Sequence, residues 1–194
     1  MSRTPSRNVD SLNYFIPKEL PTINKEGSPV SKTVYMHLSK LHSFLNDWLS
    51  LKVKGVKICK SISALKLYEC FDDYYPHQTQ PLTDGLLESL SGFENIVEGV
   101  KIINNQLQAL SQLQSKPEAV INTWSCTEIA ETVSNITRDL ENELRLKKII
   151  TENVAHCRDE NLIEVYVSAW EFEAYFNMDT CAYLFAEIGL TGIT

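Results

Sequence analysis

The fold is decided by a stretch in the N-terminal half of the chain, residues 31–62, with the sequence SKTVYMHLSKLHSFLNDWLSLKVKGVKICKSI. One row of residues recurs in it at alternating spacings of four and three, the heptad pattern of a helix that packs lengthwise against another helix. The row consists of Val34, Leu38, Leu41, Leu45, Trp48, Lys52, Gly55, Cys59 and Ile62. The pattern predicts one long helix over residues 31–71, which cannot bury its apolar row alone.

Two residues interrupt this row. Lys52 places a charge in it and Gly55 removes a side chain, and glycine inside a helix is about 1 kcal/mol less favourable than alanine. We expect either a close approach of a neighbouring helix at Gly55 or a kink there. Charge runs on helices are usually solvated or paired. A solvated helix face, or a face packed near the acidic C-terminal helix, is therefore favoured over a nucleic-acid patch. This interpretation applies to the lysines Lys52, Lys54, Lys57, Lys60 and Lys66.

The same spacing recurs further along the chain. A second apolar row contains Asn104, a candidate for fixing helix register, and Thr83 or Asp84 can cap its start. Ser125 and Glu128 form a capping box, the start signal of a third helix. The predicted helices are 31–71, 84–115, 126–157 and 161–172, with a further helix over 179–188 left open. The fold class is therefore all-α: an elongated bundle of long antiparallel, coiled-coil-like helices with a shorter, aromatic C-terminal helical unit.

The domain organisation that we predict is simple. Residues 1–30 contain several prolines among serine and threonine without periodic apolar residues, which predicts a flexible tail. Residues 31–194 form a single all-helical adaptor domain. Thr4 lies in a Thr-Pro-Ser-Arg sequence and Ser28 precedes a proline, so both are candidates for phosphorylation by a proline-directed kinase.

Composition excludes several classes of protein. The net charge is −7, and the acidic excess lies after residue 75, where 7 basic and 18 acidic residues disfavour direct nucleic-acid binding. The apolar runs are too short for a membrane span or a secretory signal. Five scattered cysteines without a Cys-x-x-Cys pair favour neither a disulfide framework nor a zinc site.

Catalytic motifs are missing from the sequence. We find no glycine-rich phosphate loop, no His-Glu-x-x-His sequence, and no nucleophile with a diagnostically spaced base. We therefore expect neither an enzyme nor a bound cofactor or metal.

Protein binding is the remaining expectation, because the apolar rows exceed what we expect the chain to hide by itself. Large aromatic residues concentrate binding energy, so candidate structural or interface anchors are Trp124, Tyr166, Trp170 and Tyr175. Glu143 and Lys147 lie four residues apart on the third predicted helix. They form either an exposed helix pair or, if they face another helix, a pair that selects register or partner.

The C-terminal half resembles the cyclin-dependent kinase 2-interacting protein family. The resemblance rests on Thr123-Trp124-x-x-Thr127-x-x-x-Glu131, Glu143-Leu144-x-Leu146-Lys147, Ala155-His156, Leu162, Tyr166-x-Ser168-x-Trp170 and Tyr175, and in the N-terminal half on Trp48-x6-Gly55-x6-Ile62-x-x-Leu65. Together these positions cover about half of the chain. The segment before residue 30 and the segment over 72–122 match no family motif.

The resemblance implies a non-enzymatic adaptor of the cell cycle, DNA replication and its checkpoint. Expected partners are cyclin-dependent and origin-firing kinases, a checkpoint kinase partner protein, AAA+ ATPase subunits and a second small helical subunit. Family members join a hexameric AAA+ assembly that acts at the replisome and in large-ribosomal-subunit maturation, so the expected location is the nucleus and also the cytoplasm. A structural coiled-coil subunit of an unrelated tethering, kinetochore or trafficking complex would fit the heptads equally well.

Overall fold

The computed structural model describes residues 28–69, 75–114 and 118–189, and it confirms the all-α class. The elements in chain order are α1 (Pro29–Ala64), the π-helical turn η1 (Leu65–Glu69), α2 (Thr79–Leu113), β1 (Ala119–Ile121), β2 (Trp124–Ser125), α3 (Cys126–Asn153), α4 (Glu160–Phe172) and α5 (Asp179–Glu187). The predicted tail lies outside the described residues except for its last three. None of the described helices is long and apolar enough to cross a membrane.

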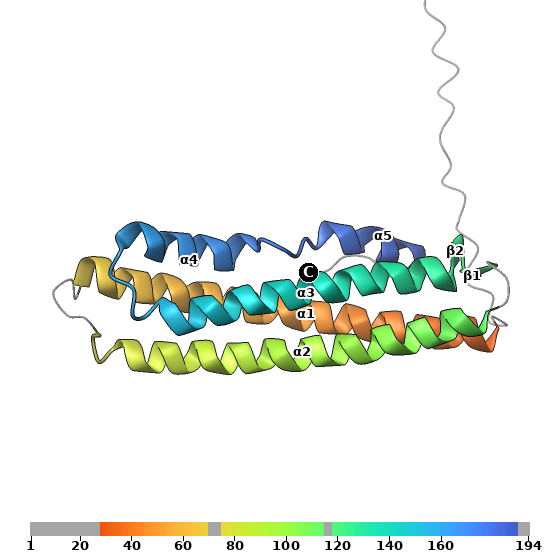
Figure 1. The fold of residues 1–194 in the computed structure, drawn as a ribbon, viewed down its shortest axis with the longest axis horizontal. Coiled ribbons are helices and arrows are strands. Elements are labelled where there is room, and N and C mark those ends of the chain that lie inside the picture. The colour runs from red at the N-terminus through yellow and green to blue at the C-terminus, as the bar shows by residue number, and fades with distance from the viewer. Residues whose placement is uncertain (1–27, 70–74, 115–117, 190–194) are drawn as a thin grey trace, which may run out of the picture.

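Three long helices and one broken helix make up the bundle. α1, α2 and α3 extend along the length of the molecule, and each runs antiparallel to the one before it (Figure 1). α4 and α5 follow one another over them. α2 packs between α1 and α3, while α4 lies mainly on α1 and α5 contacts α3. The two shorter helices therefore act as a fourth helix that is interrupted in the middle.

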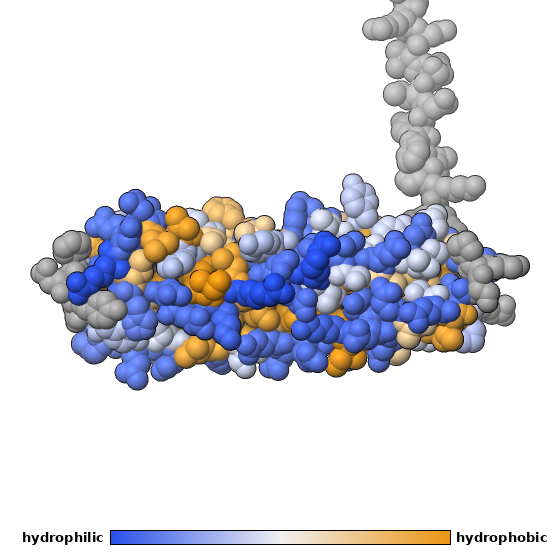
Figure 2. Space-filling model, in the orientation of Figure 1, coloured by the Kyte–Doolittle hydropathy of each residue, from blue (hydrophilic) through white to orange (hydrophobic). Residues whose placement is uncertain are grey.

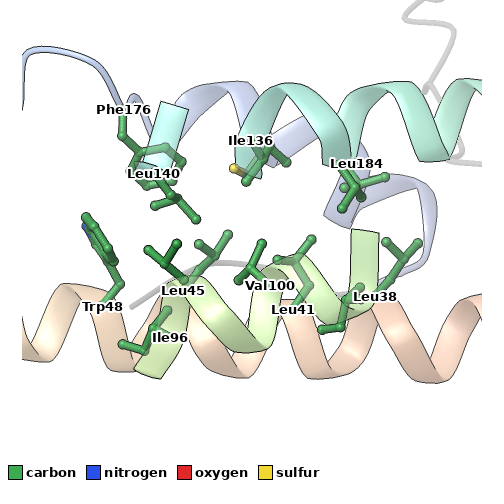
Figure 3. Packing of buried hydrophobic residues seen from close by; sticks show 14 of the residues in the cluster. Leu38, Leu41, Leu45, Trp48, Ile96, Val100, Ile136, Leu140, Phe176 and Leu184 are labelled. Carbon is green, nitrogen blue, oxygen red and sulfur yellow. The ribbon is translucent and has the colours of Figure 1, made fainter. Parts of the chain in front are cut away.

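The apolar row of α1 is covered by the chain itself. Its members Leu38, Leu41, Leu45 and Trp48 are fully buried, and Figure 3 shows them facing side chains of α2, α3 and the C-terminal helices. The expectation that the rows need another polypeptide is therefore wrong for α1. Heptad spacing fixes which face of a helix is apolar, but it does not say whether the neighbour belongs to the same chain.

Local signals explain where α1 and α3 begin. The Ser28 hydroxyl accepts a hydrogen bond from the Ser31 amide at 3.2 Å, so Ser28 caps α1. The predicted capping box of α3 is confirmed, because Glu128 accepts from the Ser125 amide at 2.8 Å while the Ser125 hydroxyl accepts from the Glu128 amide.

The second helix begins earlier than predicted. Its first residue is Thr79, and its N-cap residue, Gln78, makes no side-chain capping bond. Proline is tolerated in the first turn because its missing amide proton would have no partner there. Pro81 therefore lies inside the helix, and the prediction that Thr83 or Asp84 starts it is wrong.

A short antiparallel hairpin precedes α3 and was not predicted. β1 and β2 pair through Ala119 with Ser125 and Ile121 with Trp124. The connecting residue Asn122 has a φ of 40°, a conformation that asparagine tolerates better than most residues. Strands of three and two residues are too short to show a period in the sequence.

Glycines of α2 lie opposite large side chains of α1. A Cβ added at each of three glycines of α2 would meet a large side chain of α1 within 3.1 Å. The pairs are Gly85 with Ile58, Gly92 with Leu51, and Gly99 with Phe44. Both series recur every seven residues in opposite chain directions, so the two helices approach closely along one continuous line.

Two lysines near the end of α1 and in η1 contact groups of the C-terminal part of the chain. Lys60 pairs with Glu171 of α4 at 2.8 Å, and the buried Lys66 donates to a backbone carbonyl after α3 at 2.7 Å. Lys60 and Lys66 therefore face the C-terminal part of the chain, which agrees with a face packed near the acidic C-terminal helix.

Candidate functional site

The break in the fourth helix places a carboxylate inside the bundle. Glu173, the residue after α4, has a φ of 55° and a ψ of 118°, a backbone conformation that is costly for residues with a Cβ. The turn directs its side chain inward, where only 4% of it is exposed. The polar contacts of the carboxylate offset the cost of this backbone conformation.

Glu173 connects two other segments of the chain. Its Oε1 accepts a hydrogen bond from Trp48 Nε1 at 2.7 Å, and its Oε2 accepts one from Lys52 Nζ at 2.9 Å. Lys147 Nζ, from α3, lies 3.3 Å from Oε1. A single carboxylate between α4 and α5 therefore ties α1 to α3.

Lys147 lies at the centre of this cluster and is fully buried. Its Nζ is 3.3 Å from Glu143 Oε1 and 3.5 Å from the carbonyl oxygen of Trp170. Aromatic rings surround the ammonium, with centroids 5.0 to 5.8 Å away, and they are those of Trp170, Phe93 and Trp48. Ring faces attract a cation, so this surround replaces part of the lost hydration.

We call Lys52, Glu143, Lys147 and Glu173 the buried charge network. Glu143 completes it, because its second oxygen accepts a hydrogen bond from the backbone amide of Tyr175 at 2.9 Å. Two carboxylates face two ammonium groups, so the formal charges cancel. A buried pair of this kind adds little net stability, but removing one partner leaves an uncompensated charge and costs about 3–5 kcal/mol.

Gly55 provides the space for this arrangement. A Cβ at Gly55 would lie 2.4 Å from the indole of Trp170. The predicted close approach of a helix at Gly55 is therefore confirmed, and the neighbour is α4.

The charged groups of the network contact one another and the backbone of neighbouring segments. Burial raises the pKa of the nearby Cys59 thiol to about 12, with Lys147 acting in the opposite direction, so the thiol stays protonated. Among the described residues, no group of three or more histidine, cysteine, aspartate or glutamate side chains is placed to hold a metal ion.

The structure brings four of the six candidate binding residues together. Glu143, Lys147 and Trp170 are fully buried in the network, so in this conformation no partner reaches their side chains. Tyr175 contributes its backbone amide, and its side chain is exposed. Tyr166 is half-buried against the core on α4.

Trp124 lies apart from the network, in β2 at the end of the molecule where α3 begins (Figure 1). It is half-buried against the core. The turn beside it is fastened to α5, because the Thr123 hydroxyl donates to Glu187 at 2.8 Å and the Asn122 side chain donates to the Glu187 carbonyl at 2.5 Å.

Glu173, the carboxylate that ties α1 to α3, was not predicted from the sequence. It lies outside every helix, so no periodic pattern selects it. The interruptions of two apolar rows by Lys52 and Lys147 were the available signal, because lysines in buried rows need a carboxylate partner.

The two candidate phosphorylation residues differ in position. Thr4 lies outside the described residues. Ser28 is exposed and caps α1 through its hydroxyl.

Comparison with known proteins gives distant relatives. No protein-family model matches the chain. The cyclin-dependent kinase 2-interacting protein of Bos taurus is 24% identical over 144 residues, covering 69% of this chain and 68% of that protein. The protein of the same name from Xenopus laevis is 23% identical over 190 residues, covering 86% and 89%. The Homo sapiens protein is 23% identical over 125 residues, covering 61% and 59%. These identities support a distant relationship.

Proposed function

We propose that this chain is a non-enzymatic adaptor that binds other proteins in cell-cycle control. The observation that carries the proposal is the similarity to three proteins named for their interaction with cyclin-dependent kinase 2, which extends over up to 86% of the chain. The name of these relatives points to a cell-cycle-related interactor. A cyclin-dependent kinase is accordingly the first partner that we propose.

The geometry supports a scaffold. The buried charge network is neutral and joins α1, α3 and the turn before α5. Because these charged side chains contact one another, they fix the relative positions of the helices. A rigid, elongated bundle presents separate faces along its length (Figure 1), as a protein that contacts several others needs.

The finer proposal follows the family resemblance. The chain would link kinase and replication-checkpoint proteins, including an origin-firing kinase, to a hexameric AAA+ ATPase assembly together with a second small helical subunit. The assembly would act at the replisome and in maturation of the large ribosomal subunit. The proposed locations are the nucleus and the cytoplasm.

Quantitative affinity purification of the tagged full chain tests this function. We expect recovery of a cyclin-dependent kinase and of AAA+ ATPase subunits. Lys147→Met, which removes the central ammonium and is expected to destabilise the bundle by about 3–5 kcal/mol, should reduce their recovery. Lys148→Met, which removes an exposed lysine of the same helix, should retain them.

Two results would contradict the proposal. Recovery of tethering, kinetochore or trafficking proteins alone would favour the structural coiled-coil subunit. Substrate turnover by the purified chain in the absence of any partner would show an enzyme.

A further inference from the structure

α4 carries two apolar faces, and only one of them is used inside the bundle. The inner face contains Ile163 and Trp170, which are buried. A second row recurs at spacings of three, four and three and consists of Leu162, Val165, Ala169 and Phe172. Val165 is 57% and Phe172 77% exposed, although a helix of an isolated bundle normally turns polar residues outward.

The second row lies on the α3 side of α4. The opposite side is marked by Glu171, which pairs with Lys60 of α1 at 2.8 Å, and by Glu164, which lines a groove with Lys60 and Tyr68. Helix geometry places Val165 and Phe172 away from those acidic residues. In Figure 2, hydrophobic surface gathers over α4 and along its boundary with α3, in the left half of the view.

α3 adds a further apolar residue and a positive charge to this surface. The contacts of Tyr175 with Glu143 and of Trp170 with Lys147 show that α3 and α4 run antiparallel, so Arg145 lies level with the end of α4. Ile149, one turn further along α3, is 51% exposed. We call the exposed residues Ile149, Leu162, Val165 and Phe172 the α4 patch.

Arg145 borders the α4 patch without a carboxylate partner among the described residues. Within the described part of the chain, its guanidinium donates to the Asn142 side-chain oxygen at 3.1 Å and forms no ion pair. The acidic residues of α4 lie on the other side of the helix, where Glu171 is already paired with Lys60. Arg145 lies level with the Phe172 end of the row, and the exposed Glu152 lies one heptad further along the same face of α3. The Phe172 end of the row therefore fits an apolar ligand that carries a negative charge opposite Arg145.

We propose that the α4 patch binds an amphipathic helix of a partner protein, with an aspartate or glutamate of that helix paired to Arg145. The row from Leu162 to Phe172 spans ten residues, about 15 Å or three turns, which matches apolar residues at positions i, i+3 or i+4, and i+7 of a second helix. A second copy placed patch to patch would bring another arginine and no carboxylate from its own α4 patch. The inference rests on the proposed function, which requires that the chain binds proteins.

The test measures which proteins are recovered from cells with the tagged full chain. It compares variants of the α4 patch with matched control variants. Val165→Asp places a charge in the α4 patch, and Arg145→Glu reverses the charge at its border. The controls are Val53→Asp, because Val53 is 54% exposed on α1, and Lys57→Glu, which reverses an exposed charge on α1. Circular dichroism of each purified variant establishes that it is folded.

We expect Val165→Asp and Arg145→Glu to reduce recovery of one and the same partner protein at least about tenfold, while both controls retain it. A photoreactive phenylalanine analogue at position 165 of the full chain then identifies the contacted peptide of that partner. The peptide should have helical apolar spacing and a carboxylate. Exchange of that carboxylate for lysine in the partner should restore binding to Arg145→Glu.

The outcomes separate the two proposals. If the unmodified chain and the controls recover no protein, the proposed function fails and the α4 patch fails with it. If all variants recover the same partners equally, only the assignment of the α4 patch is overturned. Cross-linking to a second copy, to a peptide without a carboxylate, or to lipid would also overturn it.

Discussion

The indole of Trp170 lies directly over Gly55, so close that a Cβ at Gly55 would stand 2.4 Å from the ring. Alanine in place of glycine would otherwise favour the helix by about 1 kcal/mol. Here the ring is buried among other aromatic groups and has no free direction in which to move.

Gly55→Ala is therefore expected to destabilise the chain by about 1–3 kcal/mol, the usual range for overpacking. Urea unfolding followed by circular dichroism measures it. Gly85→Ala is the matched control, because its Cβ would meet only the flexible end of Ile58 at 3.1 Å. The control should be neutral or stabilised, and equal effects of the two substitutions would count against the contact with Trp170.

Removal of the central ammonium should be far more costly than removal of an exposed one. Lys147→Met leaves Glu143 and Glu173 buried beside each other, so we expect a loss of about 3–5 kcal/mol. Lys148→Met, at an exposed position, should change stability by less than about 0.5 kcal/mol. The denaturant midpoints of the two variants give the comparison. A loss of unfolding free energy in Lys147→Met as small as that in Lys148→Met would show that Lys147 does not pair with Glu143 and Glu173 in solution.

The capping box of α3 should have a pH signature. Hydrogen bonds from the backbone and side chain of Ser125 hold the pKa of Glu128 below its ordinary value. A lowered carboxyl pKa means that this contribution is present above the unfolded-state pKa of about 4.3 and is lost as pH falls through the folded-state pKa.

Ser125→Ala should cost about 1 kcal/mol at neutral pH. The difference from the unmodified chain should shrink below about pH 4, since protonated Glu128 no longer accepts both hydrogen bonds. Thr127→Ala, an exposed substitution in the same turn, serves as control. A loss that stays constant down to acid pH would contradict the role of the carboxylate.

The buried thiols should resist alkylation in the folded chain. Burial raises the pKa of Cys59 to about 12 and that of Cys181 to about 11. At about pH 8.5 a thiol of pKa about 12 is ionised to only about 1 part in 3,000, whereas an ordinary thiol is about half ionised. Iodoacetamide labelling followed by peptide mass spectrometry should show the half-exposed Cys157 reacting at least about a hundredfold faster than either.

The same raised pKa values should lower the free energy of unfolding at alkaline pH. A thiol with a higher pKa in the folded state holds its proton when the unfolded chain has lost it. The free energy of unfolding should therefore fall as pH rises above about 9, and Cys59→Ala should reduce this slope. A slope that is unchanged in the variant would show that the thiol ionises freely.

The sequence predicted the helices because their signals are local. The row from Val34 to Ile62 and the capping box at Ser125 depend only on residues close together in the chain. The start of α2 was misplaced because Thr83 and Asp84 were interpreted as its capping residues, although Pro81 before them fits the first turn of a helix.

The candidate site could be predicted only in part, for a different reason. Lys52 was recognised as a charge in an apolar row and Lys147 as the partner of Glu143. Their shared partner Glu173 lies 121 and 26 residues away along the chain, in a turn without periodicity. Which residues cover an apolar row is a tertiary property, so the row of α1 gave no indication that its own chain would bury it.

The glycine series of α2 permits one lengthwise setting of the first two helices. Gly85, Gly92 and Gly99 face bulky side chains at the same interval, so sliding by one turn would press side chain against side chain all along the line. The next fitting position lies a whole heptad away, at about 10 Å, and would leave one glycine opposite no matching side chain. α1 and α2 therefore have one preferred lengthwise register, so neither helix can slide along the other without a clash.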